Sequence, residues 1–453
     1  MAYFLYLCRQ DFIITNHKLV KMKRIKLQIR EFGRIKESEI ELTPWMIFSG
    51  ESGMGKSYLA ILVHYFFDVL LSRETMDSFF REKGFNYNDM LPNLRSNGDV
   101  FVIEKLELEE WLAKKAVEYV SYMINDKKLK ADFSIILPEE IPSSIKCRFE
   151  EEIMGMDNNE EVYLKFYLPS LTYRTKNSPV GLNEESPFAF FFRFYLMNII
   201  LGDYKALEHT FVLPPSRGAA MTESVVYKTG LFKEFLNDKQ FLESAKINNE
   251  STPQILIDLM TDVMEGKVGL VDNQYRYQLS SATDGDDMPL TAAASSIREL
   301  APIQMMIDNV NIRTAAILFE EPEAHLHPAK QRMMADVISC LSRAGTFMQI
   351  TTHSDYLLRR LNELIALQMI KNKSSHIYDE IAKTMHISED ILPDIDNLSA
   401  FILERQSDGS SKIVRQDLSK GIPYSTFYGP LKESIENKSR LTAVIKEVNN
   451  ETD

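Results

Sequence analysis

Eight consecutive residues constrain this chain more than any others. Gly50-Glu51-Ser52-Gly53-Met54-Gly55-Lys56-Ser57 matches the pattern G-x-x-x-x-G-K-[ST]. The apolar residues 46–49 before it predict a short strand, and apolar side chains recur at helical spacing over residues 56–71 after it. Between a strand and a helix, such glycines let successive backbone N–H groups curl around phosphate oxygens. The sequence therefore predicts a phosphate-binding loop (P-loop) for a nucleoside triphosphate.

Each part of this loop has an expected role. Lys56 supplies a positive charge to the β- and γ-phosphates, and the hydroxyl of Ser57 is a ligand for Mg²⁺. The other residues expected at the nucleotide contribute mainly through the backbone, and they are Gly50, Glu51, Ser52, Gly53, Met54, Gly55 and Tyr58.

Two adjacent carboxylates end a second apolar strand. Residues 315–319 read Ala-Ala-Ile-Leu-Phe and are followed by Glu320 and Glu321. Carboxylates that leave a buried strand are costly unless they are paired with a cation. We expect Glu320 to hold Mg²⁺, directly or through water, and Glu321 to polarise the attacking water. The alternative is a solvated acidic loop at the strand end.

Strands alternate with helices around these motifs. Alternating residues 23–29 and a second short run near Ile40 and Leu42 predict an antiparallel hairpin at the N-terminal side of the loop. Helices over 295–308, 329–342 and 355–367 separate strands over 315–319 and 347–351. This order predicts an α/β fold with a mainly parallel central sheet.

Composition limits the setting. The chain has 453 residues, more than one compact core usually holds, and a formal net charge of −13, which gives no general support for nucleic-acid binding. Its three cysteines, Cys8, Cys147 and Cys340, lie far apart and fit no disulfide or metal pattern, as expected in a reducing cytoplasm. The most apolar run, 188–201, is too short and polar to span a membrane.

The residues after Glu321 carry a family resemblance. Glu320 to Pro328 reads E-E-P-E-A-H-L-H-P, and Thr351-Thr352-His353-Ser354 follows a predicted strand. With the opening segment 23–33, these residues resemble the ABC-class ATPases related to SMC, RecF and OLD proteins. The chain is more closely similar to standalone AAA family ATPases of bacterial defence and mobile-element operons. The resemblance implies that ATP is the nucleotide, that residues 322–328 form a D-loop, and that His353 contacts the γ-phosphate.

Two further residues are assigned by this resemblance. Pro215-Ser216-Arg217 is similar to a P-x-R element whose arginine, Arg217, would lie near the nucleotide, the alternative being a structural ion pair. Ser295 would be the signature serine that reaches the γ-phosphate bound by a partner subunit, although Ser296 stands where relatives often have glycine. The structural alternative is that a serine only caps the start of a helix, with Glu299 nearby. His325 and His327 are read as D-loop residues and not as metal ligands.

These assignments divide the chain into five segments. We expect an N-terminal extension, native or mis-started, over 1–21, the first part of the ATPase domain over 22–71, and a large, mostly helical inserted lobe over 72–208. The second part of the ATPase domain spans 209–372, and 373–453 is a C-terminal extension suited to partner docking.

The function expected from these features is a dimeric ATP-hydrolysing switch. Separate signature and P-loop segments predict a homodimer, or a higher homo-oligomer, across two ATP sites. The resemblance implies an anti-phage defence role with a separately encoded effector, a nuclease or another toxin. Two alternatives stay open: a RecF- or SMC-like DNA repair ATPase, to which the basic run 127–130 would contribute, and an ATP-bound scaffold without hydrolysis. A membrane transporter subunit is disfavoured by the H-L-H-P segment and the large insertion.

Overall fold

The computed structural model describes residues 22–85, 99–154, 161–169, 171–176, 187–202, 207–222, 227–245, 252–272, 274–281 and 287–450. The N-terminal extension expected over 1–21 lies outside these residues. Within the described part of the chain, every helix is too short or too polar to cross a lipid bilayer.

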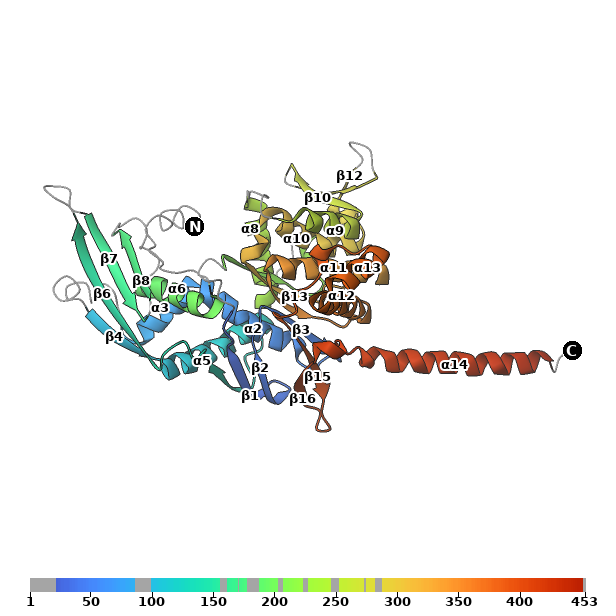
Figure 1. Ribbon diagram of the computed structural model, residues 1–453, viewed down its shortest axis with the longest axis horizontal. Helices are drawn as coiled ribbons and strands as arrows, with labels where there is room; N and C mark the ends of the chain where they lie inside the picture. Colours follow the sequence, from blue (N-terminus) through green and yellow to red (C-terminus); the bar gives the residue numbers. More distant parts are fainter. Residues whose placement is uncertain are drawn as a thin grey trace.

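A nine-stranded sheet organises the molecule (Figure 1). Its order is β5 (Ala131–Ile136), β1 (Lys26–Phe32), β2 (Ile35–Glu41), β16 (Ser411–Arg415), β15 (Leu398–Arg405), β3 (Trp45–Gly50), β14 (Phe347–Thr351), β13 (Ala315–Glu320) and β9 (His209–Leu213). The five strands from β15 to β9 are all parallel, whereas β1 pairs with β2 and β5 in antiparallel fashion. The predicted α/β fold, with its N-terminal hairpin, is confirmed.

The parallel strands are apolar because helices cover both faces. Every residue of β3, β13 and β14 is buried. Successive side chains point to opposite faces, so Phe48 and Leu318 pack with α2 (Lys56–Leu71), whereas Ile47 and Ile317 pack with α10 (Ser295–Asn309), α11 (Pro328–Ala344) and α12 (Asp355–Lys373). Burial on both faces explains why these strands read as continuous apolar runs.

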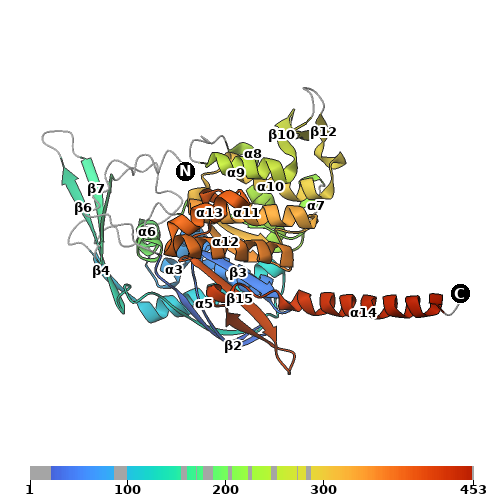
Figure 2. The same cartoon turned by 45° about the vertical axis from the view of Figure 1, so that its right-hand side comes forward.

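The segment between α2 and β9 contains more strand than we predicted. Its helices are α3 (Arg73–Glu82), α5 (Lys105–Ile124) and α6 (Pro187–Leu201), and its second sheet has the order β4 (Asp99–Glu104), β6 (Ser144–Met154), β7 (Glu161–Leu168) and β8 (Leu171–Lys176). This antiparallel sheet lies at the end of the molecule far from α12 (Figures 1 and 2). Phe149 and Phe166 on the sheet pack against Phe188 and Phe191 of α6. The prediction of a mostly helical lobe was therefore wrong in part, because the segment also contains an antiparallel sheet.

The acidic run in β6 illustrates why this sheet was missed. Glu150 pairs with Arg148 at 2.6 Å, and Glu152 pairs with Lys165 of β7 at 2.6 Å. The first pair lies within β6, and the second joins β6 to β7, where opposite charges on neighbouring strands stabilise one another. In the sequence these residues look like a solvated charged face, because the pairing strand is not visible from the run itself.

The C-terminal segment is not simply an extension. We predicted one from residue 373, but β15 pairs with β3 along six residues, from Leu398 opposite Trp45 to Leu403 opposite Gly50. Residues 398–415 therefore complete the central sheet. Beyond them, α14 (Ser425–Asn450) projects away from the body (Figures 1 and 2).

The remaining elements cover the α10 side of the sheet. A three-stranded sheet is formed by β10 (Gly266–Val271), β11 (Gln274–Leu279) and β12 (Asp287–Pro289). The other helices are α7 (Arg217–Thr222), α8 (Gly230–Ser244), α9 (Gln254–Met264) and α13 (Ser375–Met385), with short 3₁₀ turns η2 (Leu290–Ala292), η3 (Ile312–Thr314), η4 (Glu389–Ile391) and η5 (Leu418–Lys420).

Candidate nucleotide-binding site

The P-loop connects β3 to α2 through three glycines with positive φ. Gly50, Gly53 and Gly55 have φ values of +124°, +74° and +99°. A Cβ atom on Gly50 would lie 2.7 Å from the carbonyl oxygen of Leu403. Glycine is thus required there by both conformation and space. Gly55 is the N-cap of α2 and has no side chain to cap it, so the N–H groups of the first turn can bind an anion.

Lys56 is fixed above this loop. Its Nζ donates to the carbonyl oxygens of Gly50 at 3.0 Å and Glu51 at 2.8 Å, and the residue is only 5% exposed. Burial lowers the pKa of Lys56 to about 8, against the opposing charges of Glu321, Glu323 and Glu320. The ammonium is therefore poorly solvated, and it has no salt-bridge partner among the described residues. A phosphate would supply the negative charge.

Ser57 and Glu320 are in contact at the carboxyl edge of the sheet. The hydroxyl of Ser57 donates to Oε2 of Glu320 at 3.0 Å. Glu320 is 3% exposed, and burial raises its pKa to about 7 despite this hydrogen bond. Its other oxygen, Oε1, is buried without a hydrogen-bond partner among the described residues. An unpartnered carboxylate oxygen beside a hydroxyl fits the oxygen ligands that Mg²⁺ prefers.

Glu321 and His353 face the same space. Their side chains are 41% and 32% exposed, and His353 Nε2 lies 3.9 Å from Glu321 Oε1. Glu321 adopts a φ of +44°, held by a hydrogen bond from its N–H to the carbonyl oxygen of Thr351 at 3.0 Å. A left-handed conformation is costly for a residue with a side chain and is often retained at functional sites. Burial and the nearby charge of Lys56 lower the pKa of His353, so its imidazole is neutral near pH 7.

Glu323 holds the histidine segment in place, a role that our reading of the motif missed. Its Oε1 accepts hydrogen bonds from the Thr352 hydroxyl at 2.8 Å and from the His353 N–H at 2.6 Å. Burial raises the pKa of this carboxyl group. The signal was the third carboxylate of E-E-P-E, which stands two residues after Glu321.

Arg217 does not lie where we expected it. We expected it near the nucleotide, but its side chain is completely buried and is not among the residues that line the P-loop pocket. Its guanidinium donates to the carbonyl oxygens of Glu299 at 2.9 Å, Pro214 at 3.0 Å and Glu320 at 3.1 Å. The structural alternative is therefore correct: Arg217 ties the end of β13 to the start of α10.

Ser295 begins α10, as the predicted helix requires, but the capping interpretation was wrong. The N-cap is Ala294, and Glu299 is 4% exposed and lies near Arg217 and His325 without capping the helix. Ser295 is exposed and is not among the residues that line the P-loop pocket of its own chain.

His325 and His327 lie in the segment between β13 and α11. His325 has a φ of +61°, and Nδ1 of His327 accepts from the N–H of Ala329 at 3.3 Å as the N-cap of α11. Among the described residues, no group of three or more His, Cys, Asp or Glu side chains is arranged to hold a metal ion.

Eight of the predicted residues line one pocket of about 560 Å³, whereas Gly50, Glu51, Met54 and Glu320 are not part of its wall. Ser52, Gly53, Gly55, Lys56, Ser57, Tyr58, Glu321 and His353 all contribute to its wall. Two turns that we did not predict at this site complete it. They are the β1–β2 turn with Gly33 and Arg34, and the α5–β5 turn with Asp126, Lys128, Leu129 and Lys130.

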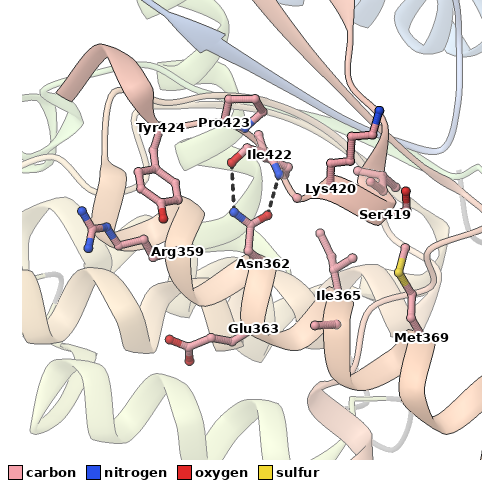
Figure 3. A pocket seen from close by; sticks show the side chains of 13 residues that line it. Arg359, Asn362, Glu363, Ile365, Met369, Ser419, Lys420, Ile422, Pro423 and Tyr424 are labelled. Carbon is pink, nitrogen blue, oxygen red and sulfur yellow. Dashed lines mark hydrogen bonds between the residues drawn. The ribbon is translucent and has the colours of Figure 1, made fainter. Parts of the chain in front are cut away.

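A larger pocket, of about 1030 Å³, lies between α12 and residues 418–424 (Figure 3). Asn362 holds its rim by accepting from the N–H of Ile422 at 2.7 Å and donating to the carbonyl oxygen of Ile422 at 2.9 Å. This pocket contains none of the predicted site residues, so its size does not make it the reactive centre.

Residues 221–358 match the family model of the AAA ATPase domain. The matched stretch includes Ser295, Glu320, Glu321 and His353 but not the P-loop. No curated protein shows significant sequence similarity to this chain.

Several solved structures of SMC head domains are distantly similar to the chain. One is an SMC head bound to the C-winged helix domain of ScpA, with 12% identity, coverage of 88% of this chain and 99% of that chain, and a TM-score of 0.38. Another is the SMC head domain from Thermotoga maritima, with 10% identity, coverage of 88% and 100%, and a TM-score of 0.33. A third is the Smc head domain with an extended coiled coil bound to the C-terminal domain of ScpA derived from Pyrococcus furiosus, with 12% identity, coverage of 92% and 99%, and a TM-score of 0.37.

Proposed function

We propose that this protein binds ATP with Mg²⁺ and hydrolyses it to ADP and phosphate. The observation that carries this proposal is the 3.0 Å contact between Ser57 and Glu320, which joins the P-loop to the carboxylate pair of β13. Around this contact, Lys56, Glu321 and His353 face one pocket. A phosphate cradle, a metal-binding carboxylate and a base are the parts that phosphoryl transfer to water requires.

Each side chain has a task in this reaction. Lys56 balances the charge on the β- and γ-phosphates, and neutral His353 donates a hydrogen bond to the γ-phosphate. Ser57 and Glu320 would hold Mg²⁺, which neutralises phosphate charge when bound. The water oxygen bonds to the γ-phosphorus, the bond to the β–γ bridging oxygen breaks, and Glu321 accepts the proton of the water.

The first test is Glu321→Gln. Glutamine keeps the shape of the side chain but cannot accept the proton, so ATP should still bind while phosphate release falls about 100-fold or more. Binding of radiolabelled ATP and release of phosphate are measured on the same preparations. Phosphate release at the wild-type rate would exclude Glu321 as the base.

We further propose that two copies complete each site. Ser295 is exposed at the start of α10 and is absent from the pocket of its own chain, so a second copy is needed to bring it to the γ-phosphate. In such a head-to-tail dimer, Lys56 of one subunit and Ser295 of the other share a site.

Complementation tests this arrangement. Lys56→Ala and Ser295→Arg variants should each be inactive alone. Mixed in equal amounts, they should regain about a quarter of wild-type activity, because half of the dimers have one intact site. Absence of recovery, with subunit exchange shown by cross-linking, would contradict the shared site.

The biological setting is proposed from the family resemblance. A cytoplasmic location is supported by Cys147 and Cys340, which are both free and buried. The proposed role is that of the ATPase of a defence system whose effector is a separate protein, and an effector gene beside this one would support it. A wild-type chain that binds ATP but releases no phosphate would instead favour a scaffold.

A further inference from the structure

The α5–β5 turn reaches the P-loop pocket from the inserted segment. Asp126, Lys128, Leu129 and Lys130 line this pocket together with the P-loop. From the sequence alone, the basic run 127–130 was linked only to the DNA-binding alternative.

The turn is held in a defined position. Asn125 ends α5 in the left-handed conformation, and the Asp126 carboxylate accepts from the N–H of Lys128 at 2.8 Å. The carbonyl oxygen of Lys130 accepts from the N–H of Gly33 at 2.9 Å, and β5 then pairs with β1. Backbone bonds to the central sheet therefore place the turn beside the P-loop.

Two groups of residues in the pocket differ in chemistry. Glu321 and His353, 3.9 Å apart, carry the polar side chains proposed to act on the γ-phosphate. In the second group, the Cα of Gly33 faces Tyr58 and Leu129: an added Cβ would lie 3.3 Å from Cδ2 of Tyr58 and 3.9 Å from Cδ1 of Leu129. Tyr58 and Leu129 thus form a small apolar wall, suited to the face of a base.

Cations surround this apolar wall. Lys128 and Lys130 are exposed, and neither forms a salt bridge with a described carboxylate. Arg34, on the β1–β2 turn, donates to the carbonyl oxygen of Gly53 in the P-loop at 3.4 Å. In a chain with a net charge of −13, such a group of unpaired cations favours an anion in this pocket.

We propose that the α5–β5 turn binds the nucleoside half of ATP. Leu129 and Tyr58 pack against the base, and Lys128 and Lys130 interact with the phosphate nearest the ribose. The inserted segment is then part of the nucleotide site itself. This inference rests on the proposed ATP binding at the P-loop.

Titration calorimetry on the full-length chain, with ATP and with inorganic triphosphate, tests this proposal. Leu129→Ala should weaken ATP binding about five- to tenfold, because one apolar contact to a base is lost, and leave triphosphate binding unchanged. The double variant Lys128→Ala/Lys130→Ala should weaken binding of both ligands about tenfold or more. Lys127→Ala is the matched control, since Lys127 lies in the same turn but does not line the pocket, and its affinities should equal those of the wild type.

The outcomes separate this inference from the proposed function. If Lys56→Ala abolishes ATP binding while the Leu129 and double-lysine variants stay within twofold of wild type, the inference is wrong and the P-loop assignment stands. If Lys56→Ala binds ATP normally, the proposed function fails. Loss of single-stranded DNA binding by the double-lysine variant, with ATP affinity retained, would also overturn the inference. Unchanged circular dichroism melting curves verify that each variant is folded.

Discussion

The hydroxyl of Ser57 donates a 3.0 Å hydrogen bond to the carboxylate of Glu320, across a separation of 263 residues in the chain. The sheet explains this contact. β3 and β13 both pair with β14 in parallel, so their carboxyl ends lie at the same edge of the sheet. In open α/β sheets, ligands bind outside this edge. The contact brings together the two segments that a nucleotide with a bound metal requires.

The first prediction concerns the buried carboxyl group of Glu320. Its pKa is raised to about 7 from an ordinary value of 4.5, so the neutral form is favoured by the folded state. The stability contribution of Glu320 is therefore full below pH 4.5 and is lost as the pH rises through 7. The side chain of Glu320→Gln is neutral at every pH. Between low and high pH, the free energy of unfolding of this variant should therefore fall by about 1 to 3 kcal/mol less than that of the wild type, in the nucleotide-free protein.

Urea unfolding of both proteins at several pH values between 5 and 8 measures this effect. Asp68 also has a pKa raised to about 7 by burial, so only the difference between the two proteins reports on Glu320. A difference that does not change with pH would contradict the prediction.

The second prediction concerns the charge of Lys56. Its pKa is lowered to about 8 in the nucleotide-free protein, and phosphate binding requires the charged form. Deprotonation of Lys56 should therefore make ATP affinity fall up to about tenfold for each unit above pH 8. Lys56→Arg stays charged and should show no such fall, whatever its absolute affinity. An equilibrium-binding series from pH 6.5 to 9.5 is the measurement, and a flat profile for the wild type would count against it.

The third prediction concerns Arg217. Replacement by methionine removes hydrogen bonds to three carbonyl oxygens and the guanidinium that lies 3.9 Å from the buried Glu299 carboxylate. The expected loss in the free energy of unfolding is about 3 to 5 kcal/mol. Arg359→Met is the control: Arg359 is 38% exposed and stacks on Tyr424 at 4.6 Å, so the loss should stay below about 1 kcal/mol. Equal losses for the two variants in urea would show that Arg217 has no special structural role.

The fourth prediction concerns Gly50. An alanine there combines a φ of +124° with a Cβ 2.7 Å from the carbonyl oxygen of Leu403, which is paired with Gly50 in the sheet. Gly50→Ala should destabilise the fold by about 2 to 4 kcal/mol. Gly409→Ala is the matched control, because Gly409 has a φ of +80° but open space around it, and should cost about 1 kcal/mol. Thermal unfolding measures both variants. Similar losses of stability would show that the close approach to Leu403 does not matter.

Local patterns in the sequence were sufficient for the strand–loop–helix unit. We predicted a helix over 56–71, a strand over 315–319 and a strand over 347–351, and the structure has α2, β13 and β14 at these places. Helical spacing, apolar runs and glycine chemistry act within a few residues of chain, so they can be read without knowing the fold. Local patterns also identified Lys56, Ser57, Glu320 and Glu321, whereas His353 was assigned by the family resemblance. The fold brings these residues to one edge of the sheet.

Motifs alone misplaced Arg217. Its position after Pro215 and Ser216 suggested a place near the nucleotide. Its guanidinium instead donates to the carbonyl oxygen of Pro214, three residues before it, and to those of Glu299 and Glu320 from distant segments. Which distant acceptors meet a buried arginine depends on packing, and a motif of three residues does not reveal it.

The amino-acid sequence by itself determined the phosphate-binding loop and the carboxylates of this protein, because short-range backbone geometry and apolar periodicity specify them. Only the tertiary structure decided that β15 completes the sheet beside β3, and that the α5–β5 turn lines the P-loop pocket. Both arrangements depend on hydrogen bonds between strands far apart in the chain, as where Lys130 accepts from Gly33 and Leu403 lies opposite Gly50. Such pairings are selected by the burial of the whole sheet, and no local pattern encodes them.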